Sequence, residues 1–403
     1  MESQAPGSRE RAPWEPPDFS LVQGGPLFQL LRRGHLADDS LMLQRRRIVV
    51  IILFAWLPLL ALSAMAGQLL GGGVAVPFLL DAEVHVKFLV AMPLLIAAEL
   101  VVHGRMLPVV KEFVQRRLIP ENAMARFDAA IASAFALRNS VLAEVLLIAL
   151  VYAVGVLIIW RHYVALAAAT WYATPSAGGT SLSLAGIWYG YVSLPVFQFL
   201  LLRWYFRFFI WARFLWQVSR IKLSLIPTHP DRVGGLGFLS GTVYAFVPLL
   251  TAHGALVAGN FANRIFHLGA SLSDFKIEIL VLVVFLLCVV VGPLTVFSRQ
   301  LRQVKRSGNR EYGALAQRYV REFDVKWLRG GAPGDEKLVG SADIQSLADM
   351  GNSFEIVRTM RAVPVSREAI IHLAFATLAP IVPLVLTMMP LEELLKRLFR
   401  ILL

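Results

Sequence analysis

The stretch "IEILVLVVFLLCVVVGPLTVF", residues 277–297, contains a single charged side chain, that of Glu278. An α-helix rises about 1.5 Å per residue, so about 20 residues cover the roughly 30 Å of hydrocarbon in a bilayer. The run is apolar at consecutive positions rather than at alternate ones, which argues against a barrel strand. The stretch therefore predicts a transmembrane helix.

Six further runs have the same character, at 48–70, 86–102, 140–160, 186–205, 236–258 and 369–390. Of the 403 residues 57% are apolar and only 16% are charged, with a mean hydropathy of +0.63. These are too few charged groups to coat a soluble domain of this size. We predict an all-α fold, a polytopic transmembrane helical bundle of about seven spans with a helical cytoplasmic loop.

The chain divides into four parts along the sequence. A proline-rich tail, 1–47, is expected to be cytoplasmic and largely disordered, with a short interfacial helix towards its end. The first six spans, within 48–297, form the bundle. A cytoplasmic loop, 298–367, is expected to hold helices over 299–328 and 341–361. The last part, 368–403, contains the seventh span and an amphipathic tail.

Two segments need a separate prediction of their position relative to the membrane. The sequence "APIVP" at 379–383 could break the seventh span into a re-entrant hairpin, in which case six spans cross the membrane. Segment 108–138 is broken at Pro120 into two amphipathic pieces. We expect these pieces to lie along the inner membrane surface.

Basic residues predict the orientation, since they stay on the cytoplasmic side of the spans they flank. Segments 1–47, 103–138, 203–235 and 298–367 hold 32 Lys and Arg residues, and the alternate loops hold four, Lys87, Arg161, Arg264 and Lys276. The N-terminus is therefore expected in the cytoplasm. The net charge of +12 is spread over all these segments, which argues against nucleic-acid binding. The expected partners are the bilayer and anionic lipid at its inner face, with homo-oligomerisation left open.

The only cysteine, Cys288, lies inside a span, so a disulfide framework and a thiolate metal cage are both excluded. The sequence "LSAMAG" at 62–67 resembles a signal-peptide cleavage site, but 47 residues precede the apolar run. That is too long for a signal peptide of roughly 15–30 residues, so the first helix is expected to be retained. No metal site is predicted, and the sequence identifies no cofactor and no catalytic residue.

The segment "THPDRVGGLG", 228–237, places His, Asp and Arg beside three glycines just before a span. It matches neither a dinucleotide fingerprint nor a phosphate loop. One interpretation is an anion nest formed by the amides of Gly234, Gly235 and Gly237, to which Arg232 adds charge and His229 a titratable group. The other is a turn, capped by Asp231 or Thr228, that the glycines allow to bend tightly.

Ionisable residues also gather at the predicted inner ends of the spans. The group comprises Glu99, His103, Glu144, His229, Asp231 and His372. Charges in hydrocarbon are costly and tend to face a bundle interior. We therefore predict that these residues and Arg232 form one polar pocket, although polar residues also accumulate near any membrane boundary.

Arg203, Arg207, Arg213 and Arg220 lie among aromatic residues in 203–222. Their separations of four, six and seven residues do not fit the three-residue spacing of a voltage sensor. They are expected to be snorkelling side chains in an interfacial aromatic belt, in contact with anionic lipid.

At "HPDRVGGLG" and "GSADIQSLADMGNSFEIVR" the chain resembles a family of uncharacterised bacterial multi-pass inner-membrane proteins. The resemblance extends over most of the chain from the first span onward. It implies a bacterial inner-membrane location and implies no activity, substrate or cofactor.

Three functions remain open from the sequence. The first is transport or ion and proton movement through a polar, cytoplasm-facing site, which prolines within six of the seven runs favour because they bend helices and create hinges. The second is a membrane-embedded enzyme with a His and carboxylate site. The third is a membrane anchor or signalling subunit whose loop 298–367 docks a cytoplasmic partner.

Overall fold

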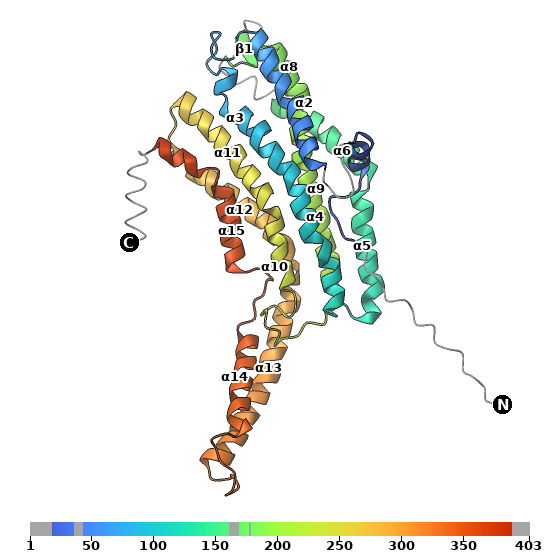
Figure 1. Cartoon of the computed structure of the whole chain (residues 1–403), viewed down its shortest axis with the longest axis vertical. Coiled ribbons are helices and arrows are strands. Elements are labelled where there is room, and N and C mark those ends of the chain that lie inside the picture. The colour runs from blue at the N-terminus through green and yellow to red at the C-terminus, as the bar shows by residue number, and fades with distance from the viewer. Residues whose placement is uncertain (1–17, 36–42, 161–168, 177–178, 389–403) are drawn as a thin grey trace, which may run out of the picture.

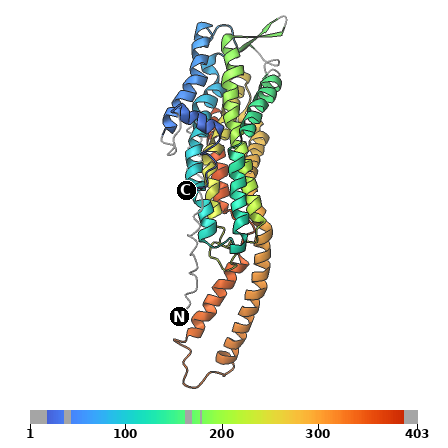
Figure 2. The same cartoon turned by 90° about the vertical axis from the view of Figure 1, so that its right-hand side faces the viewer.

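The computed structural model describes residues 18–35, 43–160, 169–176 and 179–388. These residues form an elongated helical bundle with a helical hairpin projecting from one end (Figures 1 and 2). The strands in the described ranges are β1 (Ala173–Ser176) and β2 (Gly179–Leu182), an antiparallel pair at the opposite end. The prediction of an all-α fold is confirmed.

The α-helices follow one another as α1 (Pro26–Arg33), α2 (Gln44–Met65), α3 (Ala82–His85), α4 (Met92–Gln115), α5 (Met124–Arg138), α6 (Val141–Leu150), α8 (Leu184–Trp188), α9 (Leu194–Ser219), α10 (Phe238–Val243), α11 (Val247–Leu268), α12 (Lys276–Val291), α13 (Ser298–Phe323), α14 (Ala342–Arg358) and α15 (Arg367–Leu378). Short 3-10 segments join several of them: η1 (Phe78–Leu80), η3 (Glu121–Ala123), η6 (Tyr244–Phe246), η7 (Leu272–Phe275), η8 (Gly292–Phe297) and η10 (Val382–Thr387).

Wider π-helical turns interrupt the bundle at four places, η2 (Val86–Ala91), η4 (Val151–Trp160), η5 (Tyr189–Ser193) and η9 (Asp324–Leu328). η2 and η5 each lie within a longer helix that is otherwise α-helical, and η4 continues α6 to Trp160. π-Helical turns are rare and are frequently found at functional sites. Three of them therefore mark the half of the bundle near β1 and β2.

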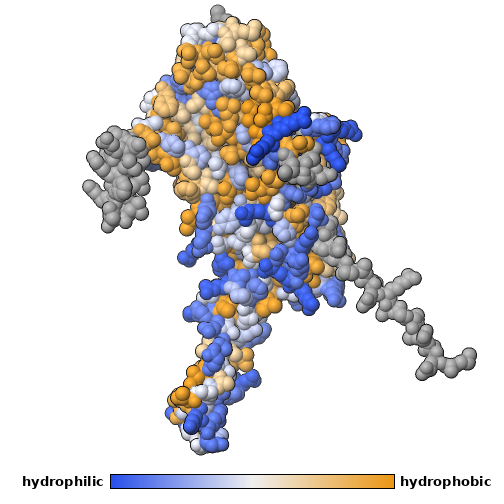
Figure 3. Space-filling model, in the orientation of Figure 1, coloured by the Kyte–Doolittle hydropathy of each residue, from blue (hydrophilic) through white to orange (hydrophobic). Residues whose placement is uncertain are grey.

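Among the residues that the structure describes, six helices are long and apolar enough to cross a membrane: Gln44–Met65, Ala82–Gln115, Val141–Ile158, Leu184–Ser219, Phe238–Leu268 and Leu272–Leu328. They contain most of each of the first six predicted apolar runs. Exposed apolar side chains gather over the upper half of the molecule in Figure 3 and cover α2 and α6 in particular. Water-facing helices would not expose such side chains, so the fold is that of a multi-pass membrane protein.

The seventh predicted span is not a continuous helix. α15 ends at Leu378, before Pro380, and the chain continues as the 3-10 segment η10. The twelve residues of α15 cover about 18 Å, well short of the roughly 30 Å of hydrocarbon. Residues 389–403, which include the predicted amphipathic tail, lie outside the described ranges.

α15 nevertheless packs closely along α11 (Figure 1). A Cβ placed on Gly254 of α11 would lie 2.0 Å from the backbone oxygen of Thr377 in α15. Only a residue without a side chain lets the two backbones approach so closely. Gly254 therefore fixes the position of α15 in the bundle.

Several helices extend well beyond the apolar runs in the sequence. α4 continues to Gln115, α9 to Ser219 and α12 leads through η8 into α13. The expected break at Pro120 is present, but α5 packs against α9 and buries Phe127 and Ile131. The expectation that 108–138 lies along the membrane surface was wrong, because its apolar face is covered by other helices.

The described part of the N-terminal tail is also packed, unlike the disordered tail expected for 1–47. Phe19 is completely buried, with its ring centroid 4.6 Å from that of Phe214 and 5.8 Å from that of Phe135. α1 then follows as a short helix beside α6 (Figure 1). Residues 1–17 and 36–42 lie outside the described ranges.

The loop 298–367 forms an antiparallel pair of helices, α13 and α14, which projects from the bundle (Figure 2). The two helices lie where the sequence predicts them. Ser341 occupies the predicted N-cap position of α14, but its side chain makes no capping hydrogen bond within the described residues. Asp343 in the first turn instead accepts hydrogen bonds from Lys326 Nζ at 2.8 Å and Trp327 Nε1 at 3.0 Å.

Candidate functional site

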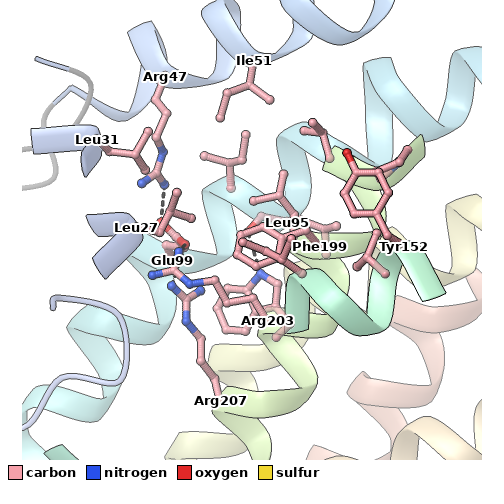
Figure 4. Close-up of a pocket in the computed structure, with 17 residues that line it drawn as sticks. Leu27, Leu31, Arg47, Ile51, Leu95, Glu99, Tyr152, Phe199, Arg203 and Arg207 are labelled. Atoms are coloured by element: carbon pink, nitrogen blue, oxygen red, sulfur yellow. Dashed lines mark hydrogen bonds and ion pairs between the residues drawn. The ribbon is translucent and has the colours of Figure 1, made fainter. Parts of the chain in front are cut away.

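Three arginines converge on Glu99 in the middle of α4 (Figure 4). Arg207 Nη2 donates to Glu99 Oε1 at 2.8 Å, and Arg203 Nη1 lies 3.7 Å from the same oxygen. Arg47 in the first turn of α2 donates through Nη2 to Glu99 Oε2. All four side chains are at least nine-tenths buried.

The spacing of these residues explains why they meet. Arg203 and Arg207 are four residues apart on α9, so both point from one face of that helix towards α4. A buried charge is tolerated only when paired and hydrogen-bonded, and a bidentate guanidinium suits a carboxylate better than an ammonium does. Glu99 thus ties together α2, α4 and α9.

Glu144 extends this cluster towards α1. It lies in the first turn of α6, and its Oε1 is 3.6 Å from Arg203 Nη2. Its other oxygen, Oε2, accepts a hydrogen bond at 2.8 Å from the backbone N–H of Leu27 in the first turn of α1. A carboxylate at this position is favourable for the helix dipole of α1. Arg203 is therefore shared by two carboxylates.

The cluster forms one end of a cavity of about 300 Å³ between α1, α2, α4, α9 and the α6–η4 helix. The remaining wall is apolar and includes Leu31, Ile51, Leu95, Val151 and Phe199 (Figure 4). Three guanidinium groups face two carboxylates, so the described charges at this end sum to plus one. Arg47 Nε is buried and has no hydrogen-bond partner within the described ranges.

The cavity is only partly enclosed, and its exposed lining residues belong to the α6–η4 helix. α2 packs on α4 and α8, and α6 packs on α9. At the rim, Ile148 and Tyr152 are 46% and 45% exposed. Both residues belong to the candidate membrane span Val141–Ile158.

His103, one turn after Glu99, contacts the N-terminal segment and not the arginines. Its Nδ1 lies 2.9 Å from Ser20 Oγ, and Arg138 Nη1 donates to the backbone oxygen of Ser20 at 2.7 Å. His103 therefore helps to hold residues 18–25 against the bundle. It borders the Glu99 cluster without joining it.

The predicted anion nest is filled by the chain's own Asp231. Asp231 Oδ1 accepts the backbone N–H groups of Val233 at 2.8 Å and Gly235 at 3.2 Å, and Oδ2 accepts that of Gly237 at 2.8 Å. Gly234 has a φ of 66° that favours glycine, and its backbone oxygen accepts from Ile226 N. The segment is thus the Asp231-capped turn that the sequence left as the alternative interpretation.

The remaining polar groups of that turn interact locally. His229 Nδ1 lies 2.9 Å from Asp231 Oδ1. The backbone oxygens of Asp231 and Arg232 both accept hydrogen bonds from Arg361, after the end of α14. The turn therefore joins the base of the α13–α14 hairpin to the bundle.

The prediction of one pocket for all the inner-side ionisable residues was wrong. The turn packs beside Leu118, just beyond the end of α4, because Ser224 N donates to Leu118 O at 2.9 Å. Glu99 precedes the last residue of α4 by sixteen positions, or about 24 Å along the helix. His372 is also apart: it is exposed, with Nδ1 2.8 Å from Glu368 O and its ring against Tyr244.

Sequence reasoning found Glu99 and Glu144 and missed their partners. Arg47 was counted only as an orientation signal, and Arg203 and Arg207 were expected to snorkel into lipid. Arginines four residues apart within an apolar run, like Glu99 and His103, could have been interpreted as one inward face. The pairing itself depends on which helices are neighbours, and the sequence does not specify this.

The fold and this site define a multi-pass helical membrane protein with a charged cluster at one end of a largely apolar cavity. Within the described ranges, no three His, Cys, Asp or Glu side chains lie close enough together to hold a metal ion. Comparison with protein-family models, curated proteins and solved structures found no match.

Proposed function

We propose that the chain is a bacterial inner-membrane protein that binds an anionic amphiphile of the inner leaflet in the cavity at Glu99 and transfers it between the leaflets. One observation carries the proposal: the cavity has an arginine-rich end and an apolar wall, and its exposed side is formed by Ile148 and Tyr152 of a candidate membrane span. A head group with negative charge fits the arginine-rich end, and an acyl chain fits the apolar wall and the exposed side.

The arginine end favours an anion because its positive charge is not fully balanced. Arg203 is 3.6 and 3.7 Å from its two carboxylate partners, longer than the roughly 2.7–2.9 Å of a charge-assisted hydrogen bond. Arg47 Nε adds a buried donor that lacks a described partner. A phosphate or carboxylate head group would supply the missing acceptors, and guanidinium groups bind both in bidentate geometry.

The apolar wall favours an alkyl chain and not a free anion. A cavity of about 300 Å³ lies at the small end of the usual range for ligand sites. It therefore accommodates the head group and the first part of a chain, and the exposed side leads the rest into the bilayer. Each buried methylene contributes about 0.8 kcal/mol.

The proposed orientation places this cluster at the inner leaflet. The 32-to-4 distribution of basic residues supports a cytoplasmic N-terminus, and the resemblance to bacterial inner-membrane proteins supports the location. Arg47 and Glu144 each lie within the first turn of a span that begins on that side. Lipid head groups would then lie at the level of the arginines.

Movement of the ligand, as distinct from static binding, is supported by the helix at the exposed side. Val151 and Tyr152 belong to the π-helical segment η4, and Pro195 of α9 lines the cavity. Sharp bends in helices occur at π-helical turns and at proline. These features provide a hinge beside the ligand.

An enzymatic role at this cluster has less support. Glu99 accepts from Arg47 and Arg207 and is held near Arg203, so its carboxylate is not available as a general base. The docking alternative has one observation in its favour. Apolar side chains are exposed at the tip of the hairpin, with Val339 88% and Leu328 70% exposed.

The test of the proposal uses the full chain reconstituted in nanodiscs. A fluorescent lipid analogue with a phosphate monoester head group should bind more tightly than its phosphocholine counterpart. Arg203→Gln should weaken binding of the anionic analogue about tenfold, the effect of losing roughly 1.4 kcal/mol. Arg213→Gln is the matched control, since Arg213 lies on the same helix but is exposed.

Transport is tested separately from binding, in proteoliposomes with the same analogue in one leaflet. The wild-type protein should increase its transfer to the other leaflet, and Arg203→Gln should reduce this increase. Equal binding of the two head groups, or equal effects of the two variants, would contradict the proposed site. Binding without transfer would retain the site and contradict the transport role.

A further inference from the structure

A second polar cluster lies inside the bundle at the end near β1 and β2, away from Glu99. Lys87 Nζ in η2 donates to Glu83 Oε1 at 3.0 Å and to Tyr189 Oη at 2.9 Å. Lys87 precedes Glu99 by twelve positions in the same span, or about 18 Å along the helix. The cluster is therefore separate from the proposed amphiphile site.

Two carboxylates are held in this cluster by side-chain amides and an indole. Asp81 Oδ1 accepts from Asn263 Nδ2 at 2.8 Å, and its Oδ2 accepts from Trp171 Nε1 at 2.8 Å. Glu83 Oε2 accepts from Asn260 Nδ2 at 3.1 Å. These neutral donors fix the carboxylates in place without neutralising their charge.

The described charges of the cluster do not balance. Asp81 and Glu83 are opposed by one ammonium group, that of Lys87. The neighbouring His85 accepts the indole N–H of Trp56 at Nδ1, which requires an unprotonated Nδ1, and its Nε2 lies 3.0 Å from the backbone oxygen of Phe78. The net charge is therefore minus one in a part of the bundle where an unpaired charge is costly.

A cavity of about 230 Å³ adjoins the cluster and is lined by Glu83, Lys87, Tyr189 and Gln198, among others. Gln198 lines the cavity, and its Oε1, which is buried close to Gly155, has no hydrogen-bond donor in the described part of the chain. The lining therefore has an unbalanced negative charge and an unsatisfied hydrogen-bond acceptor. A ligand that completes it must be a cation that donates hydrogen bonds.

The backbone is adapted to place these groups. Lys87 and Tyr189 belong to the π-helical segments η2 and η5, and Gly155 of η4 faces Gln198. A Cβ on Gly155 would lie 2.2 Å from Gln198 Oε1, so glycine at this position leaves room for the amide. Two π-helical segments, η2 and η5, thus line the cavity, and a third, η4, packs against its Gln198, as expected of a functional site.

We propose that this cavity binds ammonium or a small primary alkylammonium ion. Glu83 provides the counter-charge, Gln198 Oε1 accepts an N–H, and the rings of Tyr172 and Tyr189, with centroids 5.7 Å apart, form an aromatic wall suited to a cation. A bare alkali ion needs a nearly complete shell of oxygen atoms. A tetrahedral ammonium ion needs only a few acceptors, which the lining supplies.

The experiment measures ligand-dependent thermal stabilisation of the full chain in nanodiscs at constant ionic strength. Methylammonium chloride should raise the unfolding temperature. Sodium chloride and tetramethylammonium chloride should raise the unfolding temperature less, because both cations carry the same charge as methylammonium and neither has an N–H group. Equal shifts for the three salts would overturn the proposal.

Variants locate the effect. Glu83→Gln removes the counter-charge and should weaken methylammonium binding by about tenfold or more. Gly155→Ala displaces the flexible end of Gln198 at little cost to packing, and should also weaken binding even if Glu83→Gln folds poorly. Glu278→Gln, an exposed carboxylate outside this cavity, should leave binding unchanged. Loss of binding in Glu278→Gln equal to that in Gly155→Ala would overturn the assignment.

Discussion

At the scale of single residues, the structure depends on how buried charges are paired. Glu99 is the acceptor on which three guanidinium groups from two other helices converge. Breaking a buried ion pair by removing one partner is far more costly than losing a surface pair, since the remaining charges stay desolvated. The cluster is therefore both a structural tie and the proposed head-group site.

We predict that Glu99→Gln destabilises the protein by about 3–5 kcal/mol, because Arg47, Arg203 and Arg207 would then face one another without their shared carboxylate. Chemical unfolding in detergent micelles measures the change. The exposed Arg213→Gln variant should stay within about 0.5 kcal/mol of the wild type. A Glu99→Gln protein as stable as Arg213→Gln would show that the cluster is not tightly packed.

Acid should loosen the hairpin contact at Asp343. The hydrogen bond from Lys326 and that from Trp327 lower the pKa of Asp343 from its ordinary value of 3.8. A depressed pKa in the folded state means that the contact stabilises the hairpin above pH 3.8 and is lost as the pH falls through the lower value. The fluorescence difference between wild type and Trp327→Phe should change in that range, and Asp343→Asn should abolish the change.

At the scale of helices, the sequence predicted where most elements begin. It could not predict how far each helix continues beyond its apolar run while packed against its neighbours. The apolar run of the second span stops at 102, yet α4 continues to Gln115 because Met106, Val110 and Phe113 are buried against other helices. An amphipathic continuation has the same spacing whether it lies on a membrane or packs in a bundle. Because of this ambiguity, residues 229–232 were wrongly predicted to lie at the level of Glu99.

The same limit applies to the candidate site. Glu99 and Glu144 could be identified because carboxylates inside apolar runs are rare and costly. The assignment of Arg203 and Arg207 to the lipid interface failed because burial depends on α9 facing α4, a long-range contact. A turn capped by Asp231 or Thr228 was one of two interpretations of residues 228–237, and the hydrogen bonds from the N–H groups of Val233 and Gly237 to Asp231 favour it over an external anion.

The packing of α15 on α11 gives a prediction at this scale. Gly254→Ala should destabilise the protein by about 1–3 kcal/mol, since the added Cβ would overlap the backbone of Thr377. Gly104→Ala is the matched control: Gly104 lies inside α4 with no atom within 4 Å of the added Cβ. It should be neutral or stabilising by up to about 1 kcal/mol. Equal unfolding temperatures for the two variants would contradict the close contact.

At the scale of the whole molecule, the charge distribution and the shape support the same orientation. The hairpin and the lower ends of α4, α5 and α9 form a polar extension in Figures 1 and 3, and the basic segments lie there. The β1–β2 pair lies at the other end. The proposed amphiphile cavity at Glu99 and the proposed ammonium cavity at Glu83 would then face opposite sides of the membrane.

Cysteine labelling tests this orientation in intact cells. In a Cys288→Ser background, Ser181→Cys in β2 should react with a membrane-impermeant maleimide, and Asp335→Cys near the hairpin tip should react only after lysis. Both positions are exposed. The reverse pattern would invert the orientation and place the arginine cluster at the outer leaflet.

The central claim is that the cavity at Glu99 takes the chain of an anionic lipid from the inner leaflet. Photo-crosslinking in proteoliposomes tests it most directly, with lipids that carry a diazirine near the first carbons of one acyl chain. With a phosphatidate head group, label should concentrate in peptides that contain Ile51, Tyr152 and Phe199, and Arg203→Gln should remove it. Label spread over the outer faces of α2, α6 and α12, independent of head group and of Arg203, would contradict the claim.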